Sequence, residues 1–92
     1  MLIKMVQVLK EMRGGTASLK EIYLNPNHII SISEDTKTQE VLINEVKNLG
    51  LLEGVAFTKV IIQEGSSSKT ITVVGDPKEI YGKLKQRQVL RG

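Results

Sequence analysis

Apolar and polar residues alternate along several short stretches of this chain, with the two-residue period that half-buried β-strands show. The clearest stretch is Thr-Ile-Thr-Val-Val at residues 70–74, where β-branched side chains favour a pleated, partly buried surface. Less regular patterns indicate further strands at residues 1–12, 19–24, 28–33 and 57–63. The chain is therefore expected to form a sheet of five strands.

A different spacing predicts a helix over residues 36–49. Apolar residues recur there at Leu42, Val46 and Leu49, which share one helical face. The stretch begins with the Thr-x-x-Gln spacing of a helix start and is followed by Gly50, a residue type that commonly ends helices. We expect a helix of about three turns inserted between the third and fourth strands.

A second helix is predicted directly after the last strand. Asp76 is a helix-capping residue, Pro77 suits the first helical position, and Glu79 has the spacing of a capping box. Ile80 and Leu84 are four residues apart and lie on one face of such a helix. That face is expected to pack against the sheet.

Turn-forming residues separate the elements and indicate how they connect. Glycines at residues 13–16 suit a hairpin, Asn-Pro-Asn at residues 25–27 stops a strand, and residues 64–69 are expected to form a flexible hairpin loop. Strands in hairpin order predict an α+β fold, a mainly antiparallel five-stranded sheet with one inserted helix and a C-terminal helix. We expect residues 1–85 to form a single α+β domain and residues 86–92 a flexible basic tail.

Few side chains in the sequence suit catalysis. The 92 residues include no cysteine and one histidine, His28, which has no second histidine or cysteine with which to bind a metal. As a general base it would also need a positioned nucleophile, and a histidine that ends a turn is the simpler interpretation. We therefore expect a protein that is not an enzyme and has no catalytic, cofactor-binding or metal-binding residues and no cofactor.

Positive charge is concentrated toward the C-terminal end. The net charge is +3, and from residue 78 onward five basic residues face a single acid. Lys83, Lys85 and Arg87 are the candidate basic face for a partner, although a solvated helix end explains the same charges. Nucleic acid is the less favoured partner, because the chain has only two tyrosines and one phenylalanine for base stacking.

Two loops that combine small residues with a cation are the candidate sites for an anionic, nucleotide-like ligand. Backbone N–H groups in such loops can surround a phosphate. Neither loop has the spacing of a P-loop or of a dinucleotide-binding motif, and turn formation alone also explains both. The candidate ligand residues are Arg13, Gly14, Gly15, Ser66, Ser67 and Lys69.

Two blocks of the sequence resemble a known family. Residues 22–32 read Ile-Tyr-Leu-Asn-Pro-Asn-His-Ile-Ile-Ser-Ile, and Thr-Lys-Val-Ile-Ile at 58–62 and Thr-Ile-Thr-Val-Val at 70–74 follow on either side of Gly65. This layout is similar to that of FlbD, also called SwrD, a family of small flagellar-operon proteins. Residues 36–57 insert a helix where that family has a short turn. The resemblance implies a small non-enzymatic accessory protein that acts through protein contacts.

A second resemblance, based on fewer residues, is to CsrA. The small dimeric sheet of CsrA begins with Met-Leu-Ile and ends in a Glu-Ile-Tyr helix, and the similar residues here are 1–3 and 79–81. This resemblance is compatible with a nucleic-acid-binding regulator that uses the basic C-terminal helix.

Together these observations favour one function over two alternatives. We expect an interaction or regulatory module that contacts another protein as a homo-oligomer, with a dimer favoured because exposed strand edges pair readily. The alternatives are a protein that binds or sequesters an anionic, nucleotide-like ligand and an RNA- or DNA-binding regulator. No run of about 18 apolar residues indicates a membrane span, and the lack of cysteine fits a cytoplasmic location.

Overall fold

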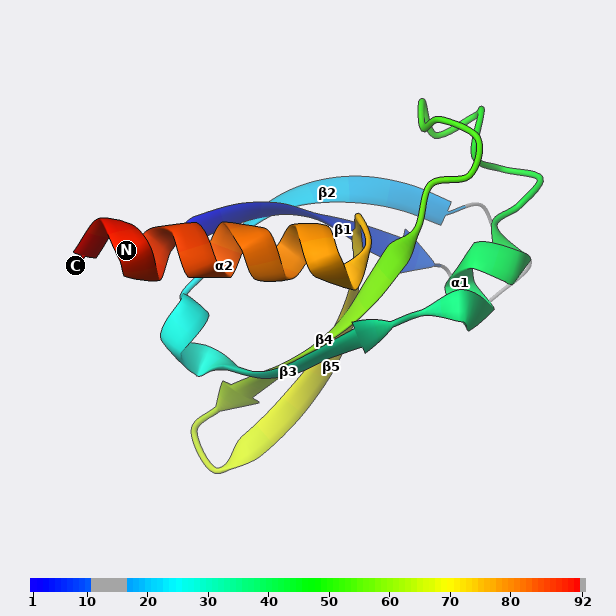
Figure 1. The fold of residues 1–92 in the computed structure, drawn as a ribbon. Helices are drawn as coiled ribbons and strands as arrows, with labels where there is room; N and C mark the ends of the chain where they lie inside the picture. The colour runs from blue at the N-terminus through cyan, green and yellow to red at the C-terminus, as the bar shows by residue number, and fades with distance from the viewer. Residues whose placement is uncertain (11–16, 92) are drawn as a thin grey trace.

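The β-strands of the protein form one sheet, with helix α2 across it and helix α1 near one end (Figure 1). The computed structural model describes residues 1–10 and 17–91, with side chains as far as residue 85. Within these ranges the elements are β1 (Ile3–Lys10), β2 (Ala17–Leu24), the 3-10 helix η1 (Pro26–His28), β3 (Ile29–Glu34), α1 (Thr36–Val41), β4 (Phe57–Glu64), β5 (Ser67–Val74) and α2 (Pro77–Arg91).

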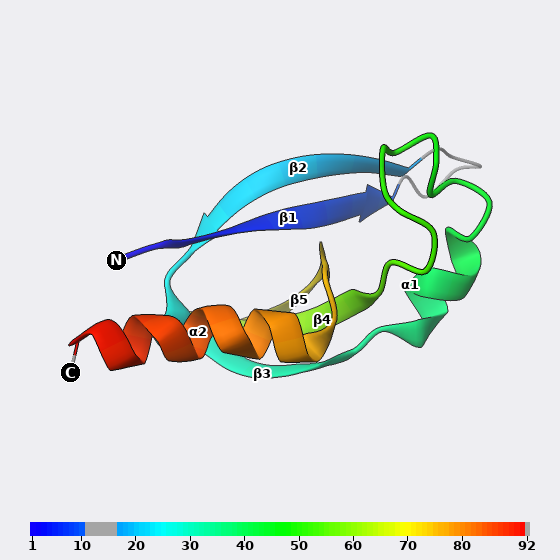
Figure 2. The ribbon, with the colours of Figure 1, turned by 45° about the horizontal axis from the view of Figure 1, so that its top comes forward.

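The sheet confirms the predicted α+β fold. Within the described residues it has five strands in the order β2-β1-β5-β4-β3, and neighbouring strands are antiparallel. The β1–β2 and β4–β5 hairpins each pair along eight residues per strand. In the described part of the chain, by contrast, the β1–β5 ladder has the single register pair Gln7–Val73. The two hairpins therefore meet at one place and diverge from it (Figure 2).

The link between β2 and β3 determines the shape of the sheet. These strands lie at opposite edges, yet only residues 25–28 connect them. A flat sheet would hold its outer strands about 19 Å apart, which is four spacings of about 4.8 Å. A link of this length that includes a turn of 3-10 helix spans only about 13 Å. The sheet must therefore curl, which gives it a concave face.

The residues of this link confirm the turn predicted at positions 25–27. The Asn25 side chain accepts a hydrogen bond from the Asn27 N–H at 2.9 Å, and Pro26 begins the 3-10 helix. The His28 N–H then donates to the Asn25 carbonyl oxygen, also at 2.9 Å. These local bonds satisfy backbone groups that leave the sheet here, as asparagine and proline commonly do in turns.

Two apolar clusters stabilise the sheet, one on each face. On the concave face, buried side chains from three strands and α2 form the first cluster, which comprises Ile3, Met5, Val60, Ile62, Ile71, Val73 and Ile80. On the opposite face, the second cluster comprises Val8, Ala17, Leu42 and Phe57. Successive side chains of a strand point to opposite faces, so β1 contributes to both clusters.

Helix α2 covers part of the concave face. Its Ile80 is buried in the first cluster and Leu84 packs against that cluster, as their spacing predicts. The Asp76 carboxylate accepts a hydrogen bond from the Glu79 N–H at 2.7 Å, which confirms the predicted cap. The helix continues to Arg91 through the segment for which the sequence predicts a flexible tail, and the flexibility of that segment stays a prediction.

The predicted length of the inserted helix, residues 36–49, is wrong. Helix α1 ends at Val41, and turns follow as far as Gly50. Val41 and Ile43 are β-branched, and the Asn44 side chain competes for backbone hydrogen bonds, so this stretch favours a helix poorly. Apolar spacing alone therefore overestimates the helix.

The turns after α1 nevertheless keep the predicted apolar face buried. Leu42 and Val46 are both buried. At the end of the segment, Gly50 has a φ of 76° and the Leu51 N–H donates to the Val46 carbonyl oxygen at 2.9 Å. This is the Schellman arrangement that commonly ends a helix, but here it closes a run of turns, because α1 has already ended at Val41.

The loop predicted at residues 64–69 is also shorter in the structure. Strand β5 begins at Ser67, so Gly65 and Ser66 alone form the turn and Lys69 belongs to the strand. The Ser67 hydroxyl donates to the last carbonyl oxygen of β4 at 3.1 Å. Pairing with β4 thus extends the ladder through residues whose composition suggests a loop.

Asp35 joins α1 to the sheet. Its buried carboxylate accepts hydrogen bonds from the Thr38 N–H at 3.0 Å, the Thr38 hydroxyl at 2.8 Å and the Thr72 hydroxyl of β5 at 2.7 Å. Burial by itself raises the pKa of Asp35, but these bonds and the charge of Lys59 outweigh burial and hold the pKa below its usual value. The ionised carboxylate therefore stabilises the fold.

The contribution of Asp35 should disappear in acid. Because its pKa in the folded protein lies below the ordinary value of 3.8, the stabilisation is present above that pH and is lost as the pH falls through the folded pKa. Asp35→Asn cannot ionise and should lower the free energy of unfolding near neutral pH by about 1–3 kcal/mol. Urea unfolding across a pH series measures this, and an unchanged acid dependence in the variant would contradict it.

The helix cap at Asp76 should be measurable in the same way. Asp76→Ala removes the acceptor of the Glu79 N–H and should lower the free energy of unfolding by about 1 kcal/mol. Asp76→Ser keeps an acceptor and should recover most of that loss. If the alanine and serine variants unfold at the same temperature, the cap contributes nothing.

Candidate functional site

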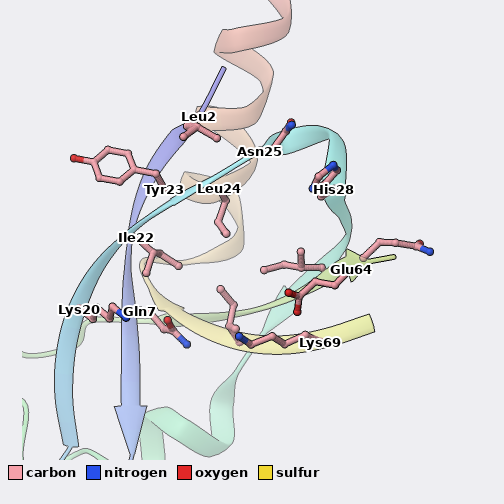
Figure 3. Close-up of a pocket in the computed structure, with 13 residues that line it drawn as sticks. Leu2, Gln7, Lys20, Ile22, Tyr23, Leu24, Asn25, His28, Glu64 and Lys69 are labelled. Carbon is pink, nitrogen blue, oxygen red and sulfur yellow. The ribbon is translucent and has the colours of Figure 1, made fainter. Parts of the chain in front are cut away.

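A groove of about 470 Å³ lies on the concave face of the sheet, beyond the part that α2 covers. The β1–β2 hairpin forms one wall, the β4–β5 hairpin forms the other, and the link through η1 lies at one end (Figure 3). The groove exists because the two hairpins diverge from the Gln7–Val73 pair. Its position therefore follows from the topology of the sheet.

Aliphatic side chains form the floor of the groove. Ile62 and Ile71 are buried members of the first cluster. Ile22 and Leu24 of β2 pack against the same cluster but stay partly exposed. The floor therefore offers accessible apolar surface to a bound group.

Polar side chains form one margin of the groove. Lys20 of β2, Gln7 of β1 and Lys69 of β5 lie along this margin in Figure 3. Lys20 is paired with Gln7 in the β1–β2 register. Lys69 is paired with Ile62 in the β4–β5 register. The register thus fixes the face of the sheet from which both lysine side chains leave. The margin that they share suits an acidic group, although the Glu64 carboxylate also lines the groove.

The end of the groove near η1 carries further hydrogen-bonding groups. Asn25 and His28 line it from the link, whereas the ring of Tyr23, another lining residue, points away from the groove (Figure 3). His28 is exposed. Across the residues whose positions are described, no group of three or more His, Cys, Asp or Glu side chains could hold a metal ion. What this end can supply is hydrogen bonding to a bound polar group.

One of the residues predicted to bind an anionic ligand lies in the groove, namely Lys69. Ser66 lies in the turn of the same hairpin and Ser67 begins β5 next to it, and both are exposed. The remaining predicted ligand residues, which fall outside the described part of the chain, are Arg13, Gly14 and Gly15.

The residues of the predicted basic face lie on α2. Lys83 and Lys85 are both exposed, but they are two positions apart, so they point to different sides of the helix. Arg87 lies beyond residue 85, the last residue whose side chain the structure describes. Lys83 and Lys85 therefore do not form one positive surface between them.

Sequence reasoning does not identify Lys20, Gln7 or the aliphatic floor as parts of a site. A signal is present in the alternation of β2, which places Lys20, Ile22 and Leu24 on one face of the strand. Only the strand order shows that this face lies opposite Lys69 on β5. The missing information is therefore tertiary.

Comparison with known proteins adds no further assignment. The chain matches no protein-family model, and no curated protein or solved structure is significantly similar to it. The resemblance to FlbD/SwrD therefore stays a prediction. Within the described residues, the helices are too short or too polar to cross a membrane.

Proposed function

We propose that this protein is a small, non-enzymatic interaction module that binds a segment of another protein in the groove between its two hairpins. The observation that carries the proposal is the combination of an aliphatic floor with two lysines on one margin. Surfaces that bind proteins commonly join an apolar centre to a polar rim. The likeness to FlbD/SwrD accessory proteins supports the same class of function.

The dimensions and charges of the groove favour a short segment as its occupant. A volume of about 470 Å³ suits a few side chains rather than a folded domain. Ile22 and Leu24 favour aliphatic or aromatic side chains, and Lys20 and Lys69 favour an acidic residue beside them. The expected ligand is an exposed peptide segment that carries apolar and acidic side chains close together.

Apolar contact supplies most of the expected binding free energy. Burying one large aliphatic side chain contributes about 1.5–3 kcal/mol, whereas an ion pair with an exposed lysine contributes about 0–1 kcal/mol. The two lysines therefore act mainly on selectivity and on the rate of association. Binding of this strength is reversible and fits a regulatory contact.

An anionic small molecule is the second candidate occupant of the groove. The observation that favours it is that Lys20, Lys69 and the Gln7 amide share one margin (Figure 3). These groups can bind a phosphate or carboxylate while the aliphatic floor contacts a ring. This alternative retains Lys69, which the sequence already predicts as a ligand residue. It places the ligand in the groove and not in the loops.

Peptides that bind the groove should combine acidic and apolar residues. Selection from a random displayed library on immobilised wild-type protein should enrich such sequences. The double variant Lys20→Glu/Lys69→Glu should weaken the binding of a selected peptide by about tenfold, because two attractive charges become repulsive. Fluorescence anisotropy measures the change, which should shrink at high salt as charges are screened.

The double variant Lys83→Glu/Lys85→Glu is the matched control for this experiment. It makes the same change in net charge at two exposed lysines of α2, outside the groove. We expect its peptide affinity to stay close to that of the wild type. Enrichment of basic peptides, or equal effects of the two double variants, would overturn the assignment of the groove.

Native mass spectrometry of freshly purified protein should distinguish the two candidate occupants. A bare chain that binds the selected peptides supports the peptide-binding function. A bound mass of nucleotide size that disappears in Lys20→Glu/Lys69→Glu supports the small-molecule alternative. If such a mass persists in that variant, the small molecule is not held by the lysines of the groove.

A further inference from the structure

An apolar tip is found at the end of the molecule where α1 lies. A turn at residues 52–55 is closed by a hydrogen bond from the Val55 N–H to the Leu52 carbonyl oxygen at 3.2 Å. Gly54 occupies the third position of this turn and has a φ of 80°, and a positive φ at that position is what a type II turn requires. The turn projects Leu52 into solvent with 84% of its surface exposed. One exposed apolar side chain is ordinary on a protein surface, so what matters is the surface that surrounds Leu52.

An open hollow of about 270 Å³ lies next to this turn. Ile43, Val46 and Val55 give it an aliphatic side, Gln39, Glu53 and Gly54 complete the lining, and Ile43 is itself 68% exposed. Because an apolar cavity of about 150 Å³ already accepts a benzene-sized group, the hollow has room for a leucine side chain. Leu52 projects beside the hollow of its own molecule and does not line it.

Two opposite charges lie in the same region. The Lys47 ammonium is 3.8 Å from a Glu53 carboxylate oxygen, and both side chains are more than 80% exposed. At this exposure the pair contributes little to the stability of one molecule. Each charge is therefore accessible to the opposite charge of another molecule.

We propose that this surface binds the same surface of a second copy and so forms a two-fold symmetric dimer. In a two-fold interface every contact occurs twice. If one residue of the first protomer contacts a second residue of its partner, that second residue of the first protomer contacts the first residue of the partner. Leu52 of each protomer enters the hollow of the other, and Lys47 of each lies beside Glu53 of the other. A different protein would need this patch to supply only one member of each contact, either the leucine or the hollow and either the lysine or the glutamate. This patch carries both members of each contact.

The proposed dimer leaves the groove open. The link through η1, which borders the groove, lies at the other end of the molecule from α1 (Figures 1 and 2). The dimer interface is therefore independent of the function proposed for the groove and goes beyond it. Two grooves on one dimer would bind a partner that carries two suitable segments with increased avidity.

Removal of the projecting leucine should prevent dimer formation. Sedimentation equilibrium of the wild-type protein should show a monomer–dimer equilibrium. Leu52→Asp should raise the dissociation constant by about a hundredfold or more, because two leucines per dimer lose their apolar contact. The exposure of Leu52 means that the variant should keep the wild-type circular dichroism spectrum. Tyr81→Asp alters another exposed side chain, on α2, and should leave the dissociation constant unchanged.

Charge reversal tests whether the contact is two-fold symmetric. Lys47→Glu and Glu53→Lys each place two pairs of like charges across the interface, so each variant alone should dimerise more weakly than the wild type. An equal mixture of the two variants should form heterodimers with wild-type affinity, because every pair across the interface is then opposite in sign.

Three results would each overturn the proposed dimer. The first is a wild-type protein that stays monomeric at all concentrations, which would leave the apolar tip to a different partner. The second is an unchanged dissociation constant in Leu52→Asp. The third is a mixture of the two charge variants that associates no better than either alone. Each of these results is independent of peptide binding, so failure of the dimer and failure of the groove are distinguishable.

Discussion

The length of one link constrains the whole structure. The strands at the two edges of the sheet are joined by residues 25–28, and a flat sheet would hold its edges too far apart for that link. Curling of the sheet creates the concave face on which the first apolar cluster and α2 pack. It also leaves a groove where the helix no longer covers that face. Asn25 and Pro26 thus shape the candidate site, although in the sequence they indicate only a turn.

Much of the fold is predictable from the sequence because the signals involved act over short distances. Asp76 and Pro77 specify a helix start through atoms of the next turn, and the β-branched run at residues 70–74 specifies a strand. The errors occur where apolar spacing coincides with a weak local preference for helix, or where the backbone depends on a distant strand. Apolar spacing over residues 42–50 correctly indicates which face is buried but does not show that the backbone leaves the helix. Ser67 belongs to a strand because β4 pairs with it.

The candidate site is much less predictable, because a groove is a property of two hairpins at once. Lys69 can be identified as a cation near small residues, but that argument concerns a loop and not a groove. Lys20 and Ile22 share one face of a strand in any reading of the alternation. Their place opposite β5 follows only from a strand order that no local pattern records. A site built from distant segments therefore requires the structure.

The pair between Gln7 and Val73 also affects how the chain folds. It joins β1 to β5, so the centre of the sheet cannot close until residue 73 has left the ribosome. The β1–β2 hairpin is complete long before β5 is synthesised, and during that interval the inner edge of β1 has no strand to pair with. Such non-local pairing slows folding, and an uncovered edge favours association between unfinished chains. We therefore expect the nascent chain to be most vulnerable to aggregation just before β5 emerges.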